Sequence, residues 1–255
     1  MASLGVRFDD FANRATNRLI QRIPGPQIAV PTDQPIVSFT FDDVPDTALT
    51  AGADILEKYG AHGTFYIAGG MVGRQEPQRR LITAEGCLEL ARRGHELGCH
   101  TFGHHNVRHL YGPALEQDND ANRAFFARLA PGLRPRNFAY PYNAGSFRAR
   151  QLLAQRFRSA RGGLNGINRG LTDRTYLRGM PIERSDERVL GLHRTVDAFV
   201  ANPGWLIFFA HDIADEPTAH GCTPQSFEAL VRHVLEAGCK VLTVNAALDR
   251  FGVAP

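Results

Sequence analysis

The chain has 255 residues, of which 43% are apolar, and its formal net charge is only +3. This length and composition allow a large buried core, which we assign to one α/β domain of barrel size rather than to two small domains. The low net charge and the scattered arginines argue against a nucleic-acid partner, and no stretch reaches the ~18 consecutive apolar residues of a membrane span.

An amphipathic helix is expected at the start of the chain. Six apolar residues within the first 23 positions recur at helical spacing, namely Phe8, Phe11, Ala15, Leu19, Ile20 and Ile23. We expect this helix to pack on the body of the protein or on a partner, and a proline-containing connector follows it to Pro35. The predicted organisation is therefore an N-terminal helix and connector over residues 1–35 and a barrel domain over residues 36–255.

Short β-prone runs alternate with helical patterns through the rest of the chain. The predicted strands are Ile36–Phe41, Thr64–Ala68, Glu96–His100, Asn137–Tyr140, Ser159–Gly162, Trp205–Ala210 and Lys240–Val244. The predicted helices are Thr47–Tyr59 capped by Asp46, Ala84–Arg93 capped by Thr83, Pro113–Leu129, Phe147–Phe157, Leu192–Val200 and Pro224–Ala237 capped by Thr223. Residues 163–189 are rich in loop signals and receive no assignment.

This alternation predicts a parallel sheet. A strand that is followed by a helix and then by another strand favours parallel pairing with a right-handed crossover, and seven such strands favour a closed or nearly closed barrel. An open doubly wound sheet is the alternative, but no G-x-G-x-x-G motif or P-loop follows any of the strands.

Titratable side chains stand at several predicted strand ends. Asp42 and Asp43 follow the first strand, His100 ends the third, and His211 follows the sixth. In an α/β barrel the C-terminal strand ends meet on one face, where active sites are built. We therefore expect these side chains to lie close together, although each alone could serve in a turn or in packing.

The spacing of two histidines suggests a metal site. His100 and His104 are four residues apart, which lets one turn or tight loop direct both imidazoles at one ion, but this spacing alone is weak. A carboxylate from the first strand would complete a facial triad that suits zinc, iron(II) or another divalent ion. If Asp43 is that ligand, Asp42 projects differently and is free to act as a general base. The alternative is a helix-capping turn at both aspartates.

Four short motifs together resemble the NodB-homology polysaccharide deacetylases of carbohydrate esterase family 4, over roughly Ile36 to Val244. They are Thr40-Phe-Asp-Asp43, His100-Thr-Phe-Gly-His104, Phe138-Ala-Tyr-Pro-Tyr142 and Phe209-Ala-His-Asp212. The resemblance implies a distorted (β/α)7-type TIM-like barrel. It also implies Asp42 as base, His211 as acid, a divalent metal, with zinc favoured, on Asp43, His100 and His104 (rather than His105), and the Tyr142 main-chain N–H in an oxyanion hole.

The sequence departs from this family pattern at three places. Ala139 and Asn143 stand where the third motif has an arginine and a glycine, so the arginine that pairs with the catalytic aspartate must come from elsewhere, with Arg161 or Arg184 as candidates. Val44 replaces a common glycine. No fourth motif is visible, which leaves the carboxylate partner of the acid histidine open among Asp173, Asp186 and Asp197.

These features predict a metal-dependent hydrolase that removes an acetyl group, with N-acetyl favoured, from a sugar, oligosaccharide or polysaccharide precursor. The expected partner is thus an acetylated carbohydrate, and the sequence indicates no oligomeric state. Two alternatives are an amidase for small non-sugar amides and a catalytically silent glycan-binding module. Because the N-terminus lacks the apolar run of a secretory signal, we expect a cytoplasmic protein.

Overall fold

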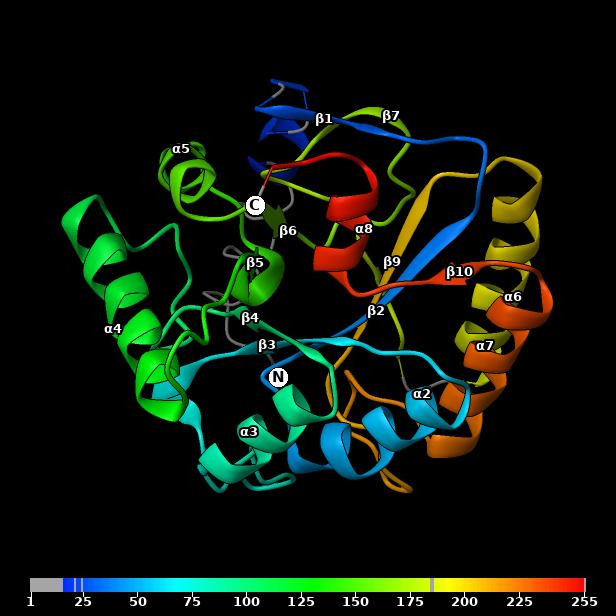
Figure 1. Cartoon of the computed structure of the whole chain (residues 1–255), viewed down its shortest axis with the longest axis horizontal. Helices are drawn as coiled ribbons and strands as arrows, with labels where there is room; N and C mark the ends of the chain where they lie inside the picture. Colours follow the sequence, from blue (N-terminus) through cyan, green and yellow to red (C-terminus); the bar gives the residue numbers. More distant parts are fainter. Residues whose placement is uncertain (1–15, 21, 24, 184–185, 255) are drawn as a thin grey trace, which may run out of the picture.

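A curled parallel sheet forms the centre of the computed structural model, which describes residues 16–254 apart from 21, 24, 184 and 185 (Figure 1). Within this part of the chain the sheet has eight strands in the order β6-β5-β4-β3-β2-β9-β8, with β10 beside β2. The strands are β2 (Ile36–Asp42), β3 (Thr64–Ile67), β4 (Glu96–Cys99), β5 (Asn137–Ala139), β6 (Ser159–Arg161), β8 (Met180–Pro181), β9 (Trp205–Ala210) and β10 (Lys240–Val241).

Helices connect the strands and cover the outside of the sheet (Figure 1). They are a π-helical turn η1 (Ala48–Ala53) continued by α2 (Asp54–Lys58), then α3 (Ala84–Arg92), α4 (Pro113–Leu129), α5 (Phe147–Arg156), α6 (Asp186–Ala201), α7 (Pro224–Glu236) and α8 (Val244–Arg250). None of the described helices is both long and apolar enough to cross a bilayer.

The two ends of the sheet meet through a short bridge. Arg161 in β6 pairs with Leu177, and the chain then runs on to β8, which pairs with β9. All strand pairs of this sheet are parallel. The predicted (β/α)7-type barrel, as a single domain, is therefore confirmed.

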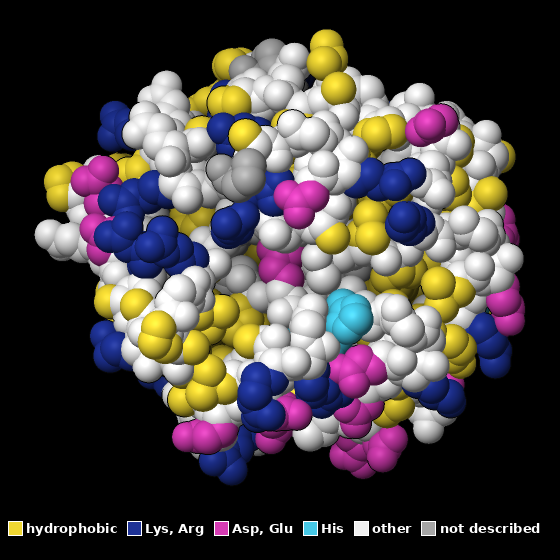
Figure 2. Space-filling view, viewed as in Figure 1, with side chains coloured by type: hydrophobic (Ala, Val, Ile, Leu, Met, Phe, Trp, Pro, Cys, Tyr) yellow, Lys and Arg dark blue, Asp and Glu magenta, His cyan; other side chains and the backbone are white. Residues whose placement is uncertain are grey.

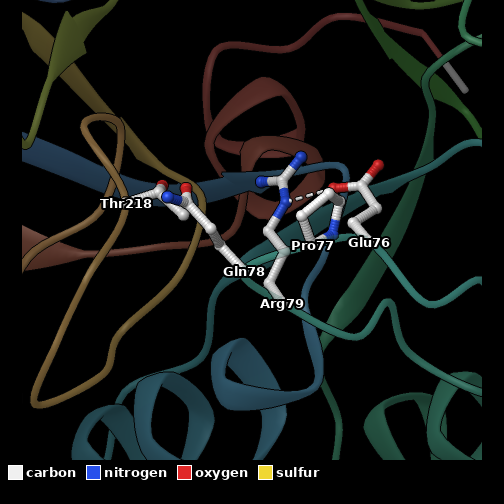
Figure 3. A pocket seen from close by; sticks show the side chains of 5 residues that line it. All are labelled: Glu76, Pro77, Gln78, Arg79 and Thr218. Atoms are coloured by element: carbon white, nitrogen blue, oxygen red, sulfur yellow. Dashed lines mark hydrogen bonds and ion pairs between the residues drawn. The ribbon is translucent and has the colours of Figure 1, made fainter.

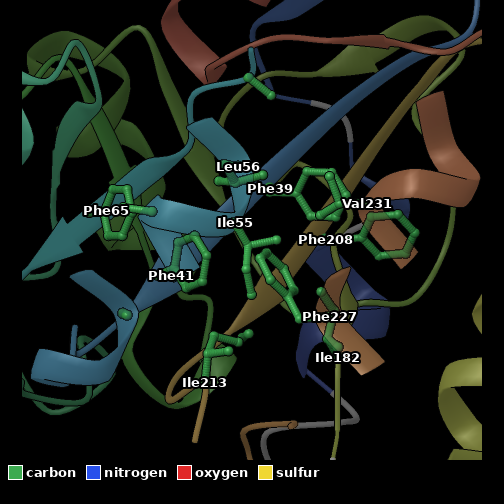
Figure 4. Close-up of a cluster of buried hydrophobic side chains, with 14 of the residues drawn as sticks. Phe39, Phe41, Ile55, Leu56, Phe65, Ile182, Phe208, Ile213, Phe227 and Val231 are labelled. Carbon is green, nitrogen blue, oxygen red and sulfur yellow. The ribbon is translucent and has the colours of Figure 1, made fainter. Parts of the chain in front are cut away.

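The alternation of side chains along β2 explains how this strand serves both the core and the site. Val37, Phe39 and Phe41 face the helices and join a cluster of aromatic and aliphatic side chains with Phe65 and Phe227 (Figure 4). The rings of Phe41 and Phe65 stack with centroids 4.6 Å apart. Because successive strand residues point to opposite faces, the intervening residues of β2, including Asp42, point into the barrel.

The barrel interior is apolar at one end and polar at the other. Trp205 and Ile207 of β9 lie in a second buried cluster that plugs the N-terminal ends of the strands. The Trp205 indole donates to the Ser38 hydroxyl at 2.9 Å. Further along the axis the interior holds charged side chains, among them Asp42 and the fully buried Arg161. The apolar side chains thus close one end of the barrel, and the charged side chains that a reaction could use lie at the other end.

Several helix boundaries follow the predicted signals. The side chains of Thr83 and Thr223 accept hydrogen bonds from main-chain N–H groups in the first turns of α3 and α7. The prediction of Asp46 as a cap was wrong, because Asp46 and Thr47 are themselves helical and lead directly into the π-helical turn. The helix ends at Lys58, and Gly60 in the turn that follows has a φ of +68°, which suits glycine.

The structure contains elements that the sequence patterns did not predict. Strand β1 (Gln27–Val30) lies in the predicted connector and pairs antiparallel with β7 (Gly170–Asp173) from the unassigned segment. The residues of β7 are half-buried or exposed, so no apolar alternation marks it, and β8 is only two residues long. The last predicted strand ends at Val241, and α8 follows, capped by Thr243.

The N-terminal segment packs on the barrel. Residues 16–20 and 22 are helical, whereas the rest of the predicted helix lies outside the described residues. Ile20 is fully buried, and its carbonyl accepts a hydrogen bond from Arg150 of α5. Asn17 donates to the Asn143 carbonyl at 2.7 Å and accepts from the Gly145 N–H at 3.0 Å. The segment therefore supports the loop that follows β5.

Candidate metal centre and active site

The predicted site residues all follow the C-terminal ends of strands. Asp42 ends β2 and Asp43 follows it, His100 follows β4, and His211 follows β9. Tyr142 lies in η3 (Pro141–Asn143), the short 3-10 turn after β5. Because these strands are parallel neighbours, residues that are far apart in sequence converge at one end of the barrel.

The loops that carry these residues have an unusual backbone. Among the described residues, six that are not glycine have positive φ, and all six lie in three of these loops: Asp43, Val44, Thr101, His104, Tyr142 and Asn143. Such conformations cost energy and accumulate at functional sites, where the surrounding structure enforces them. Val44 has a φ of 52°, in the region that the expected glycine would adopt easily, and its fully buried side chain packs in the core.

Asp43 directs one carboxylate oxygen at two imidazoles. Its Oδ1 lies 2.9 Å from His104 Nε2 and 3.7 Å from His100 Nε2. One donor atom of each residue lies within 4.8 Å of the other two. Asp43 Oδ1 is nevertheless a buried acceptor without a hydrogen bond. The left-handed turn after Asp42 produces this orientation, because it interrupts the strand alternation at Asp43.

His100 is oriented by the neighbouring strand. Its Nδ1 lies 2.8 Å from the Ala139 carbonyl oxygen, so Nδ1–H donates and Nε2 presents its lone pair toward Asp43. Burial lowers the pKa of His100 to about 4, which keeps this imidazole neutral at physiological pH. A neutral imidazole with its other nitrogen hydrogen-bonded to a carbonyl is the usual form of a metal-ligating histidine. The Asp43 oxygen and the two imidazoles that it faces therefore fit a divalent cation.

Arg79 is a neighbour of Asp43 that the sequence patterns did not single out. Its guanidinium donates to Asp43 Oδ2 at 2.8 Å and to Glu76 at 2.6 Å. Arg79 comes from the loop between β3 and α3, where no motif or periodicity marks it. Burial raises the pKa of Asp43, but His104, His100 and His211 lower it more, so that the net pKa falls below its ordinary value.

Arg161 supplies the guanidinium that the third motif lacks. It is fully buried in β6, and it donates one hydrogen bond to Asp42 and another to the Asn143 side-chain oxygen at 3.2 Å. Its guanidinium carbon lies 4.5 Å from the centre of the Phe209 ring. Arg161 was one of two predicted candidates, and the other, Arg184, lies outside the described residues.

Asp42 is held by one oxygen and left open at the other. Oδ2 pairs with Arg161, whereas Oδ1 is buried without a hydrogen-bond partner. Burial raises the pKa of Asp42, but Arg161, followed by His100 and His211, lowers it, so the net pKa lies below its ordinary value. The carboxylate is therefore ionised, and one of its oxygens can accept a proton.

His211 lies beside the two aspartates and is positioned by main chain. Its Nε2 is 3.8 Å from Asp43 Oδ2, and its Nδ1 is 3.3 Å from the His220 carbonyl oxygen. Burial lowers the pKa of His211, although Asp42 and Asp43 act against that effect. Its predicted carboxylate partner is not found among the side chains that the structure describes. Asp173 pairs with Arg150, Asp197 pairs with His233, and the Asp186 side chain is not described.

Tyr142 lies at the open edge of the site. Its side chain is 61% exposed, and its ring centre is 4.8 Å from that of His104.

The loop that carries His104 is held by Asp118 of α4, which accepts hydrogen bonds from the N–H groups of Phe102 at 2.6 Å and Gly103 at 3.1 Å. Asp118 was not predicted, because a helix residue with this role has no local signal.

A cavity of about 250 Å³ adjoins the site (Figure 3). It is lined by Glu76, Pro77, Gln78, Arg79 and Thr218, and Figure 3 shows Arg79 paired with Glu76 at its wall. Since Arg79 also contacts Asp43, the cavity begins next to the candidate metal ligands. Four of the five lining residues, Glu76, Gln78, Arg79 and Thr218, carry groups that can form hydrogen bonds with a ligand.

Solved structures share this architecture. A family 4 acetyl xylan esterase from Clostridium thermocellum, solved in complex with a cobalt ion, matches 86% of this chain and 93% of its own with a TM-score of 0.62 at 23% identity. The Xyl-CE4 domain of a multidomain xylanase from the hindgut metagenome of Trinervitermes trinervoides matches 88% and 94% with a TM-score of 0.59 at 19% identity. At these identities the likeness shows the fold.

Sequence comparison gives the family. A peptidoglycan-N-acetylglucosamine deacetylase of Bacillus cereus is 32% identical over 100 residues, or 39% of this chain and 43% of that protein. A chitooligosaccharide deacetylase of Azorhizobium caulinodans is 28% identical over 123 residues, or 48% of this chain and 55% of that protein. The chain thus spans less than two thirds of either relative. Because the sequence model described as polysaccharide deacetylase matches residues 29–156, half of the chain, this protein belongs to that family.

Proposed function

We propose that this chain is a metal-dependent hydrolase that removes an acetyl group, with N-acetyl favoured, from a sugar, oligosaccharide or polysaccharide precursor. One observation carries the proposal: Asp43 faces two imidazoles, whereas the adjacent Asp42 pairs with Arg161. Two neighbouring carboxylates thus have two different environments. The names of the Bacillus cereus and Azorhizobium caulinodans relatives support an N-acetylated amino sugar as the substrate.

Asp43, His100 and His104 are the proposed ligands of a divalent ion, with zinc favoured. Two imidazole nitrogens and one carboxylate oxygen suit zinc and leave coordination positions open for water and substrate. A bound ion would polarise the acetyl carbonyl and lower the pKa of a water molecule to about 7. Arg79 keeps the second oxygen of Asp43 occupied, which leaves Oδ1 for the ion.

Asp42 is the proposed general base. Arg161 holds its Oδ2 and favours the ionised form, while Oδ1 is open to accept the proton of the attacking water. General-base catalysis of this kind contributes about 10²–10⁴ in rate. The main-chain N–H of Tyr142, in its left-handed turn, is the proposed donor to the developing oxyanion, where a preorganised donor stabilises the transition state.

His211 is the proposed general acid. Its Nδ1–H donates to the His220 carbonyl, and its Nε2 lies on the side of Asp43. A proton on Nε2 would pass to the sugar nitrogen as the carbon–nitrogen bond breaks, which releases acetate and a free amine. Burial lowers the pKa of His211, and the neighbouring carboxylates of Asp42 and Asp43 offset only part of this effect.

The test is an acetate-release assay on N-acetylated oligosaccharides with metal-loaded and chelator-treated protein. We expect turnover that is lost on chelation and restored by zinc. Asp42→Asn should reduce turnover by about 10²–10⁴ while the metal content stays unchanged. Turnover that survives chelation would refute metal dependence. Cleavage of small amides alone would identify an amidase, and glycan binding without turnover under several metals would identify a silent module.

A further inference from the structure

Six arginines from separate parts of the chain line one groove. The groove has a volume of about 1140 Å³, and these arginines are Arg123, Arg134, Arg136, Arg156, Arg158 and Arg174. Among the described residues, Asp120 is the one acidic side chain in the lining. Figure 2 shows the resulting concentration of basic side chains in dark blue, between the regions where Figure 1 places α4 and α5.

The groove lies away from the candidate active site. Arg136 immediately precedes β5 and Arg158 immediately precedes β6, so the groove borders the N-terminal ends of these strands. The candidate site follows the C-terminal ends of the same sheet. A ligand in the groove therefore does not contact the proposed metal ligands, and the groove is a separate surface.

Two of the six arginines stabilise the fold. Arg174 donates to the carbonyl oxygens of Ala154, Phe157 and Arg158 at 2.9–3.0 Å. Arg158 is 6% exposed and donates to Asp249 at 2.7 Å, among other partners. These two side chains fix the wall of the groove, and their hydrogen bonds account for their presence.

The other four arginines carry charge that the protein does not balance. Arg123 and Arg156 share the Asp120 carboxylate, at 3.5 Å and 2.6 Å from the same oxygen. Arg134 and Arg136 are exposed, and the structure gives neither guanidinium a hydrogen bond or an ion pair with any described residue. Four guanidinium groups thus face one carboxylate in a concave surface.

We propose that this groove docks an acidic polysaccharide, a glycan whose units carry carboxylate groups. A guanidinium binds a carboxylate through two parallel N–H bonds, and unpaired guanidiniums along one groove match a chain with repeated anionic groups. The aromatic side chain in the lining, Phe157, packs on Phe138 with ring centroids 5.3 Å apart. It is the one aromatic residue among the described lining residues, whereas a groove for single-stranded nucleic acid stacks successive bases on several aromatic side chains. Membership of a polysaccharide deacetylase family favours a glycan as the polymer.

The binding test uses the full chain and two double variants of equal charge. Arg134→Gln/Arg136→Gln removes the unpaired guanidiniums of the groove, and Arg194→Gln/Arg232→Gln removes exposed arginines on α6 and α7 instead. Polygalacturonate is the probe, dextran is the neutral control, and a single-stranded oligonucleotide represents the competing class. Calorimetry at about 20 mM and 150 mM salt gives the affinity and its salt dependence.

We expect the wild-type chain and the α6/α7 variant to bind polygalacturonate equally, and the groove variant to bind about tenfold more weakly with a smaller salt dependence. Circular dichroism would verify that both variants are folded. Equal affinities of the two variants, an absence of binding at about 20 mM salt, or tighter binding of the oligonucleotide than of polygalacturonate would each overturn the proposal. Because no turnover is measured, the result is independent of the proposed hydrolase activity.

Discussion

Ala139 of β5 and Arg161 of β6 lie directly opposite each other in the sheet. The family pattern has its arginine at the first of these positions, and this chain carries one at the second. Paired positions of neighbouring parallel strands point to the same side of the sheet, so the guanidinium still enters the barrel and reaches Asp42. Asn143 stands where the family pattern has a glycine, and it adopts the left-handed conformation expected of that glycine. Its side-chain oxygen also accepts a hydrogen bond from Arg161.

The pairing of Arg161 with Asp42 predicts a shift in the pH profile. Arg161→Lys keeps the positive charge but loses the planar arrangement of N–H donors that a guanidinium provides. Because Asp42 would then be held less firmly, we expect turnover to fall by about 10²-fold. The pKa of Asp42 should rise because burial is then less well opposed, so the acidic limb of kcat/KM should move to higher pH. The control is Arg178→Lys at a half-buried arginine, and it should leave the acidic limb in place. An unmoved limb in the Arg161 variant would count against Asp42 as the base.

The adjacent histidines His104 and His105 provide a matched test of the metal ligands. His104 faces Asp43, whereas the His105 side chain is 57% exposed and lies beside Asp118. An ion at about 100 times its Kd stabilises a protein by about 2.7 kcal/mol, which raises the Tm of a chain of this size by several degrees. We expect His104→Ala to lose most of the zinc-induced rise in Tm and His105→Ala to keep it. The reverse pattern would move the ligand to His105.

Arg79 should stabilise the metal-free protein as the counter-ion of Asp43. Arg79→Gln leaves a buried carboxylate without its guanidinium, and we expect the free energy of unfolding to fall by about 1–3 kcal/mol. Arg80→Gln changes the same charge at the exposed neighbouring position and should have little effect. A bound zinc ion supplies a replacement positive charge beside Asp43. Zinc should therefore reduce the difference in the free energy of unfolding between the two variants, measured by urea unfolding. A difference that zinc leaves unchanged would contradict this role.

His95 should make stability depend on pH. Its Nδ1 accepts from the Gly63 N–H at 3.0 Å, and its Nε2 lies 2.8 Å from Glu57, so the neutral ring fits this site. Burial lowers the pKa of His95, although Glu57 opposes the effect. The unfolded chain therefore binds a proton more readily, and this contribution is present above about pH 6.5 and lost as the pH falls toward the folded pKa.

Urea unfolding at several pH values between 5 and 8 measures this effect. We expect His95→Gln to lose less stability than the wild-type chain as the pH falls below 6.5, because glutamine does not titrate. His109→Gln, at an exposed position, should keep the wild-type slope. Identical slopes for all three proteins would remove His95 as a source of the pH dependence.

The sequence alone determined the parallel barrel and the identity of the residues that meet at its open end. Apolar runs and helical spacing are local signals, and the position of Asp42, Asp43, His100 and His211 at strand ends follows from them. The two-residue period of a strand also predicts that Asp42 and Asp43 project in different directions. These conclusions need no knowledge of which strand lies beside which, beyond the general rule for parallel sheets.

The tertiary structure alone decided how those residues are held. Arg161 replaces the missing arginine because of the register between β5 and β6, and no spacing within the sequence records that register. Arg79 reaches Asp43 from a loop without periodicity, and the short strand β8 exists only through pairing with β9. The physical reason is the same in each case: hydrogen bonds and ion pairs between distant segments depend on through-space geometry, whereas sequence patterns report only on neighbours along the chain.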